Sequence, residues 1–194
     1  MDREVTKYYD SIAEDYDERS NKFARDRFRE EISHYIYEND AVLELGCGSG
    51  MLLSELNAKK KVGIDSSPGM IRQPNWGGVT LLKQDAEKLK FRNRTFDVVY
   101  SVNLLEHTAH PERVISEAER VLKESGKLII ITPNGDMEFI LNIIEWLGLK
   151  IPEGKHRFIS KKELFTIIDK KRVMEYKTLV FGLFHYAVVS QWVR

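Results

Sequence analysis

Three glycines on alternate positions, Gly46, Gly48 and Gly50, end an apolar run that begins at Val42. Such a run predicts a β-strand that gives way to a tight turn, where missing Cβ atoms let backbone N–H groups approach a ligand. Asp65 ends the next apolar run, about 20 residues further on, where an acidic side chain can accept hydrogen bonds from ribose hydroxyls. Together these residues predict a site for a nucleotide-containing cofactor.

The spacing of the glycines argues against one class of nucleotide site. Dinucleotide-binding dehydrogenases use the pattern G-x-G-x-x-G, whose third glycine permits close helix packing. Counted from Gly46, that position is Met51, and the third glycine comes one residue early as Gly50. The dehydrogenase fingerprint is therefore absent, and a nicotinamide-dependent oxidoreductase is a rival hypothesis that predicts NADH binding.

Several segments resemble motifs of one enzyme family, the class I S-adenosylmethionine-dependent methyltransferases. Residues 44–50 resemble its motif I, residues 63–70 its second motif, and Gln84-Asp85-Ala86 its adenine-contacting third motif. Residues 96–107 resemble its fourth strand with the loop after it, and residues 122–133 its fifth strand with the preceding helix. These motifs occur in the family's order along the chain.

The resemblance covers roughly residues 40–135 and implies that the chain binds S-adenosylmethionine and releases S-adenosylhomocysteine. It implies that Glu44 and the glycine backbone hold the methionine end, Asp65 the ribose hydroxyls, and Asp85 with Ala86 the adenine. Ligands of open α/β sheets bind beyond the carboxyl ends of the strands, so we expect these residues to converge on one crevice. The expected cofactor-binding residues are Tyr8, Tyr16, Glu44, Gly46, Cys47, Gly48, Gly50, Asp65, Ser66, Met70, Asp85, Ala86, Ser101 and Asn103.

Residues 8–17 resemble the family's cap helix, which folds over the cofactor. We expect a helix over residues 4–18, on which Tyr8 and Tyr16 lie eight residues apart and therefore on one face. Their aromatic rings could sit beside a sulfonium cation. Packing in the core is the alternative role for this pair.

His107 is the candidate catalytic residue. A general base is needed only if the methyl acceptor is a hydroxyl or a protonated amine, and histidine has a suitable unperturbed pKa of about 6.5. A structural role is the alternative, because Leu-Glu-His is widespread in the family. Ubiquinone-pathway O-methyltransferases resemble the chain at Glu106 and His107, and some hold a divalent ion there with a further glutamate. Asn103 stands in place of that acid, so we expect no metal.

The elements that position these residues follow from apolar runs that alternate with helical patterns. This alternation predicts an α/β fold, a parallel sheet wound on both faces. With the resemblance, it predicts a Rossmann-like, doubly wound, seven-stranded sheet, mostly parallel with an antiparallel final strand and helices on both faces. The expected strands lie near 41–46, 61–65, 78–83, 96–101, 126–132, 172–181 and 184–193, and the expected helices near 4–18, 22–38, 50–58, 67–72, 111–122, 137–148 and 161–168.

A chain of 194 residues can bury about 70% of its unfolded surface in one core, so we expect a single methyltransferase domain over residues 1–194. We divide it into four parts. These are N-terminal cap helices at 1–38, a cofactor-binding core at 40–134, a substrate-covering insertion at 135–170 and a terminal β-hairpin at 171–194.

Composition limits the partners. The formal net charge is zero, whereas proteins that bind nucleic acids carry a basic excess, so we expect no nucleic-acid substrate. No apolar run approaches the roughly 18 residues of a membrane span, and residues 1–4 show no signal-peptide pattern. The single cysteine, Cys47, cannot form an internal disulfide. We therefore expect a cytoplasmic protein with no membrane span, either a monomer or a homodimer.

The resulting functional hypothesis is a methyltransferase that acts on a small molecule by direct displacement, closest in pattern to ubiquinone- and menaquinone-type enzymes. Two alternatives stay open. One is a methyltransferase that acts on protein, lipid or RNA, and the other is a non-catalytic S-adenosylmethionine-binding regulatory module. The pattern does not identify the acceptor or its reacting atom.

Overall fold

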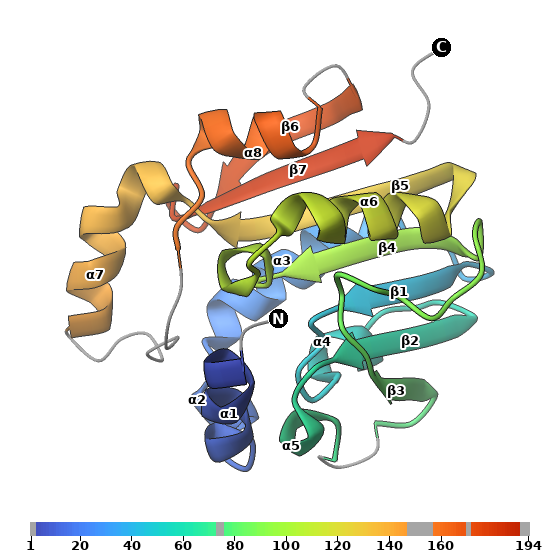
Figure 1. Ribbon diagram of the computed structural model, residues 1–194, viewed down its shortest axis with the longest axis horizontal. Helices are drawn as coiled ribbons and strands as arrows, with labels where there is room; N and C mark the ends of the chain where they lie inside the picture. The colour runs from blue at the N-terminus through green and yellow to red at the C-terminus, as the bar shows by residue number, and fades with distance from the viewer. Residues whose placement is uncertain (1–2, 73–75, 147–156, 170–171, 191–194) are drawn as a thin grey trace.

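The computed structural model describes residues 3–72, 76–146, 157–169 and 172–190. Within these residues seven strands form one sheet, in the order β3-β2-β1-β4-β5-β7-β6 (Figure 1). The expected α/β architecture is confirmed. The strands are β1 (Ala41–Leu45), β2 (Lys60–Asp65), β3 (Val79–Lys83), β4 (Phe96–Val102), β5 (Leu122–Pro133), β6 (Val173–Leu179) and β7 (Phe184–Ser190).

The first five strands pair in parallel, and β7 pairs antiparallel with both β5 and β6. The expected reversed final strand and terminal hairpin are therefore confirmed within residues 173–190. Strand order reverses between β1 and β4, where Leu45 pairs with Ser101. The carboxyl ends of β1, β2 and β4 thus lie together at the switch point, which is where open α/β sheets bind ligands.

Helices cover both faces of the sheet (Figure 1). Within the described part of the chain no helix has the length and apolar character that crossing a membrane requires. The helices are α1 (Arg3–Ile12), α2 (Tyr16–Arg19), α3 (Lys22–Ser33), α4 (Met51–Ser54), α5 (Pro68–Ile71), α6 (Pro111–Val121), α7 (Glu138–Trp146) and α8 (Lys161–Ile167), with 3-10 helices at Leu105–His107 and Gly135–Met137.

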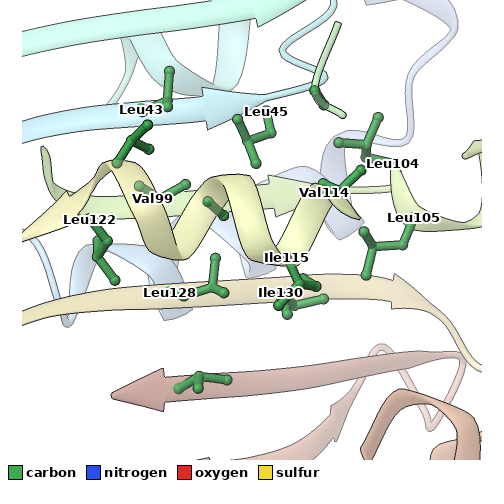
Figure 2. Close-up of a cluster of buried hydrophobic side chains, with 14 of the residues drawn as sticks. Leu43, Leu45, Val99, Leu104, Leu105, Val114, Ile115, Leu122, Leu128 and Ile130 are labelled. Carbon is green, nitrogen blue, oxygen red and sulfur yellow. The ribbon is translucent and has the colours of Figure 1, made fainter. Parts of the chain in front are cut away.

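Alternate residues of the central strands supply two separate cores, because successive side chains in a strand point to opposite faces. One core packs α6 and α8 against the sheet, and Figure 2 shows part of it beneath α6. The other packs α3 and α4 against the opposite face. The first core includes Leu43, Leu45, Val99, Leu128, Ile130, Val114 and Ala118, and the second includes Val42, Val98, Tyr100, Ile129, Ile131, Phe28 and Ile32.

Local capping explains two of the helix starts. Ser67 accepts a hydrogen bond from the Met70 N–H with Pro68 in the first turn, and Ser160 accepts one from the Glu163 N–H at the start of α8. Satisfying these otherwise unpaired N–H groups favours helix initiation at those positions. Both features follow directly from the residue types.

Three expected helices differ from the structure, two because they end early and one because it is divided. The helix expected over 22–38 ends at Ser33, and the one expected over 50–58 ends at Ser54. The prediction of a single helix over 4–18 is wrong, because α1 ends at Ile12 and α2 begins at Tyr16. A tertiary contact accounts for this break, since the Ser49 hydroxyl donates to Asp17 and ties α2 to the loop after β1. The last two residues of the helix expected over 137–148 lie outside the described residues.

His185 joins the terminal hairpin to the segment that leads into α8. Its ring is fully buried, Nδ1 lies 2.9 Å from the Tyr176 hydroxyl, and Nε2 lies 3.0 Å from the Ile159 carbonyl. The carbonyl can only accept, so Nε2 carries the proton and Nδ1 accepts from the hydroxyl. Burial lowers the pKa of His185 and so favours the neutral ring.

A depressed histidine pKa makes stability fall in acid. The unfolded chain takes up a proton near the ordinary pKa of about 6.5 while the folded chain does not, so the free energy of unfolding decreases as pH falls through that value. We expect His185→Gln to flatten this decrease between about pH 6.5 and pH 5. Urea unfolding at several pH values measures this decrease, and a substitution of the exposed His110, His110→Gln, is the control. An unchanged slope in His185→Gln would contradict the neutral buried ring.

Candidate active site

Two adjoining cavities lie at the carboxyl ends of β1, β2 and β4. The larger has a volume of about 220 Å³ and the smaller about 40 Å³. Residues of the loops after β1 and β4 line both, together with two tyrosines from the N-terminal helices. The shared lining residues are Tyr9, Tyr16, Gly46, Gly48, Val102 and Asn103. A ligand that extends from one cavity into the other would therefore pass along the glycine loop.

The glycine loop requires residues without side chains. Gly46 has φ of 69°, and a Cβ there would lie 2.8 Å from Cδ1 of Leu104. Gly48 has φ of 54°, and its N–H donates to Oδ2 of Asp65 over 2.9 Å. Left-handed backbone costs other residues roughly 1–2 kcal/mol, so glycine is favoured at both positions. The loop thereby joins the end of β1 to the carboxylate that ends β2.

Asp65 lines the smaller cavity beside Ser66 and Met70. Its Oδ1 accepts from the Ser67 N–H over 2.8 Å and its Oδ2 from the Gly48 N–H. Burial raises the pKa of Asp65, and these N–H groups oppose the rise. The Ser66 backbone also donates to this carboxylate, and the three N–H groups leave part of its acceptor capacity for a ligand. A ribose hydroxyl matches this arrangement.

Glu44 lines the larger cavity from β1 and is 3% exposed. Its Oε2 is buried and has no hydrogen-bond partner among the described residues. Burial raises the pKa of Glu44 to about 8, with the neighbouring Tyr100 hydroxyl opposing the rise. Oδ1 of Asn103 is a second buried acceptor that lacks a partner within the described ranges, and Asn103 also lines this cavity. Unpaired buried acceptors are costly, and a bound ammonium group would satisfy them.

The N-terminal helix α1 closes the smaller cavity. Thr6 and Ser66 are joined through their hydroxyls over 3.1 Å, and the Tyr9 hydroxyl lies 3.1 Å from Nε2 of His107. Asp10 accepts from the Gly69 N–H over 2.7 Å and also from the Ser67 hydroxyl. Helix α1 is therefore attached both to the loop that carries Asp65 and to the loop after β4.

The structure brings most of the expected site residues together. Those that line one or both cavities are Tyr16, Glu44, Gly46, Cys47, Gly48, Asp65, Ser66, Met70, Asn103 and His107. Their functional roles stay predictions. His107 is buried and lines the smaller cavity with Asp65, and it does not belong to the lining of the larger one.

Five expected cofactor-binding residues lie outside both cavity linings. Gly50 is the N-cap residue of α4, and Ser101 is buried within β4. Ala86 is buried in the hydrophobic core that packs under α6, while Oδ1 of Asp85 accepts from the Glu87 N–H. Tyr8 of α1 is the fifth, and its neighbour Tyr9 lines both cavities instead.

Sequence reasoning missed Tyr9, which lines both cavities and whose ring centroid lies 6.1 Å from that of Tyr16. It also missed Thr6 and Asp10, which hold α1 in place. The aromatic pair at positions 8 and 9 was the available signal, but the eight-residue spacing selected the wrong member. Two turns of an α-helix take about seven residues, which is the spacing of Tyr9 and Tyr16, and Tyr16 begins a second helix.

A family model described as a methyltransferase domain matches residues 43–130. The ubiquinone biosynthesis O-methyltransferase of Cereibacter sphaeroides is 31% identical over 163 residues, which cover 75% of this chain and 66% of the relative. An uncharacterized protein of Methanocaldococcus jannaschii is 30% identical over 87% of this chain and 67% of its own length. The chain thus spans about two thirds of the length of these curated relatives.

A solved structure of similar fold is an S-adenosylmethionine-dependent methyltransferase of Thermotoga maritima, with a TM-score of 0.77 and 22% identity over 96% of this chain and 99% of that one. S-adenosylmethionine is the methyl donor of the matched family, and the carboxylates at both cavities suit it. The chain belongs to the class I S-adenosylmethionine-dependent methyltransferases.

Proposed function

We propose that this protein transfers a methyl group from S-adenosylmethionine to a small-molecule acceptor bound in the larger cavity. The observation that supports this most is the pair of carboxylates on adjoining cavities. Asp65 lies at the smaller cavity with acceptor capacity for ribose hydroxyls, and Glu44 lies at the larger one with a buried oxygen that lacks a partner among the described residues. These positions suit the two ends of one extended cofactor.

When bound, the cofactor supplies a methyl group on a positively charged sulfur. The protein must then align the acceptor with that carbon and exclude water, and such alignment can contribute roughly 7–11 kcal/mol. Tyr9 and Tyr16 line the junction of the two cavities, where their rings shield the reacting atoms and can face the positive charge. His107 contacts Tyr9, so we assign it the role of positioning that ring.

The size of the larger cavity favours a small acceptor. Its volume of about 220 Å³ lies below the roughly 300–1,000 Å³ of typical small-molecule sites. The methionine end of the cofactor would fill part of it. In our proposal residues 1–38 and 135–170 cover the site. The contacts of α1 and the position of Leu141 of α7 in the cavity wall support this covering role.

A second candidate function is methylation with the help of a protein partner, for which one solved structure of similar fold provides a precedent. The complex of a Haloferax volcanii methyltransferase with the Trm112 methyltransferase activator has a TM-score of 0.77 and 16% identity over 99% of this chain and 98% of that one. This second candidate predicts that the isolated chain is inactive on small molecules.

Two measurements test the proposed function. Calorimetry should detect the binding of S-adenosylhomocysteine to the protein. At a concentration a hundredfold above its Kd, this ligand should raise the free energy of unfolding by about 2.7 kcal/mol. Incubation of the protein with S-adenosylmethionine and pooled small metabolites should then yield a product heavier by CH₂, because the methyl group replaces a hydrogen that leaves as a proton. Binding of NADH without S-adenosylhomocysteine would overturn the proposal. Cofactor binding with no product would favour the partner-dependent enzyme or the regulatory module.

A further inference from the structure

Tyr100 of β4 lies beside Glu44 of β1 in the sheet. The two residues are partners in the register of these parallel strands, as are Val42 and Val98 two positions earlier. Because side chains alternate between the faces of a sheet, Glu44 and Tyr100 share the face that α3 and α4 cover. Tyr100 is fully buried and Glu44 nearly so. A hydroxyl and a carboxyl group are therefore neighbours within an apolar layer.

These two side chains carry complementary hydrogen-bonding atoms that the fold leaves unused. In the described part of the chain, neither the Tyr100 hydroxyl nor Oε2 of Glu44 has a hydrogen-bond partner. A buried polar atom without a partner lowers stability. Phenylalanine would fill the same space in the core without that cost. Packing alone therefore does not account for a tyrosine at this position.

The Tyr100 hydroxyl favours the charged form of Glu44. Burial raises the pKa of Glu44 to about 8, the Tyr100 hydroxyl opposes this rise, and the charge of Asp65 adds to it. Burial also raises the pKa of Tyr100 well above its usual value, so its hydroxyl stays protonated and can donate. The other titratable or charged residues that line the larger cavity with Glu44 are Tyr9, Tyr16, Asp17, Arg19, Arg25 and Cys47.

We propose that Tyr100 is a positioning residue, whose hydroxyl donates to the Glu44 carboxylate when that carboxylate binds the amino group of the cofactor. This inference rests on the proposed role of Glu44 and adds the residue that orients it. Tyr100 belongs to neither cavity lining, so it acts on the cofactor through Glu44. A charge-assisted hydrogen bond from the protein side fixes the carboxylate and leaves further lone pairs for the ammonium group.

Tyr100→Phe tests this inference, because it removes one oxygen and keeps the ring. A hydrogen bond to a charged group corresponds to at least about a factor of ten, so the pKa of Glu44 should rise by about one unit. Below its pKa, Glu44 must lose a proton when the cofactor binds. The Kd for S-adenosylhomocysteine should therefore increase about tenfold at pH 7, and the difference should narrow to about twofold at pH 9. Calorimetric titration at both pH values measures the change.

Tyr186→Phe is the matched control. Tyr186 is also fully buried in the core that includes Tyr100, and its hydroxyl donates to the Glu31 carbonyl over 3.4 Å. It lies on β7, and its substitution should leave the Kd within about twofold at both pH values. In a Glu44→Gln background, Tyr100→Phe should likewise change the Kd by about twofold at most, because no carboxylate remains to be oriented.

A second measurement covers a variant that does not fold. The melting temperature of Tyr100→Phe at pH 7 without ligand should not fall, because the substitution removes an unpaired hydroxyl. If the variant does not fold, infrared spectroscopy of protein with isotope-labelled tyrosine rings replaces the titration. Addition of S-adenosylhomocysteine should shift a tyrosine C–O band in the wild-type protein, and Glu44→Gln should abolish that shift. A shift that persists in Glu44→Gln would overturn the inference.

The outcomes separate this inference from the proposed function. Failure of the wild-type protein to bind S-adenosylhomocysteine would refute the proposed function itself. If the wild-type protein binds it, only the role of Tyr100 is refuted when Tyr100→Phe leaves the Kd unchanged, or when the loss is equal at pH 7 and pH 9. A loss at pH 7 that narrows at pH 9, and that Tyr186→Phe does not show, supports the inference.

Discussion

Asp65→Ala is expected to weaken binding of S-adenosylhomocysteine by at least tenfold. Hydrogen bonds to a charged group contribute about 1.5–3 kcal/mol each, and every 1.4 kcal/mol is a factor of ten in Kd. The substitution removes the carboxylate that we expect to accept from the ribose. It also leaves the N–H groups of Gly48 and Ser67 without their present partner, which loosens the glycine loop. Calorimetric titration of both proteins measures the difference.

Asp40→Ala is the matched control for this experiment. Asp40 also accepts a backbone N–H, that of Tyr37, but it lies just before β1 and therefore at the opposite end of the sheet. Its substitution should leave the Kd for S-adenosylhomocysteine within twofold. Melting curves establish that each variant is folded. If a folded Asp65→Ala protein binds S-adenosylhomocysteine with wild-type affinity, Asp65 does not bind the ribose.

The strands and the cofactor loop could be predicted because their signals are local. Apolar runs rich in valine and isoleucine mark β1, β4 and β5, and alternation within them assigns side chains to the two faces. The left-handed turn at Gly46 and Gly48 needs glycine whatever surrounds it. An acidic residue at the end of the second strand follows from the same topology.

The covering elements could not be predicted with the same accuracy, because long-range contacts determine them. Asp10 binds Gly69 from 59 residues away, and no local pattern pairs these two positions. Residues 4–18 have helical periodicity, yet the helix is interrupted between Ile12 and Tyr16, and the contact between Asp17 and Ser49 attaches α2 to the loop after β1. Tyr9 of α1, and not Tyr8, lines the cavity. Tertiary contacts of this kind override local helix propensity.

Arg25 shows a further limit of sequence reasoning. Helix α3 also carries Lys22, Arg27 and Arg29, and each of these forms an ion pair. In the sequence Arg25 is one more charge on an amphipathic helix, and such charges usually lie on a solvated face. Only the packing of α3 against the sheet identifies the cation that lines the cavity.

Glu44→Gln is expected to stabilise the ligand-free protein while it weakens cofactor binding. The glutamate pKa is about 8 in the folded protein and about 4.5 when unfolded, because burial disfavours the carboxylate. The folded state therefore binds more protons than the unfolded state between these values, and the free energy of unfolding falls as pH rises from 4.5 to 8. A neutral glutamine avoids this loss, which is about 3–5 kcal/mol at pH 8. Urea unfolding at pH 5 and pH 8 measures it.

Binding of S-adenosylhomocysteine should deprotonate the Glu44 side chain. The positively charged amino group that S-adenosylhomocysteine carries favours the carboxylate, so binding should release up to about one proton at pH 7, and the Kd should fall up to about tenfold from pH 6 to pH 7. Calorimetry in two buffers with different ionisation enthalpies measures the proton release. In Glu44→Gln both effects should vanish, whereas Glu55→Gln, at a site paired with Arg29, should retain them. A Kd that is independent of pH in the wild-type protein would contradict the contact between Glu44 and the charged end of the cofactor.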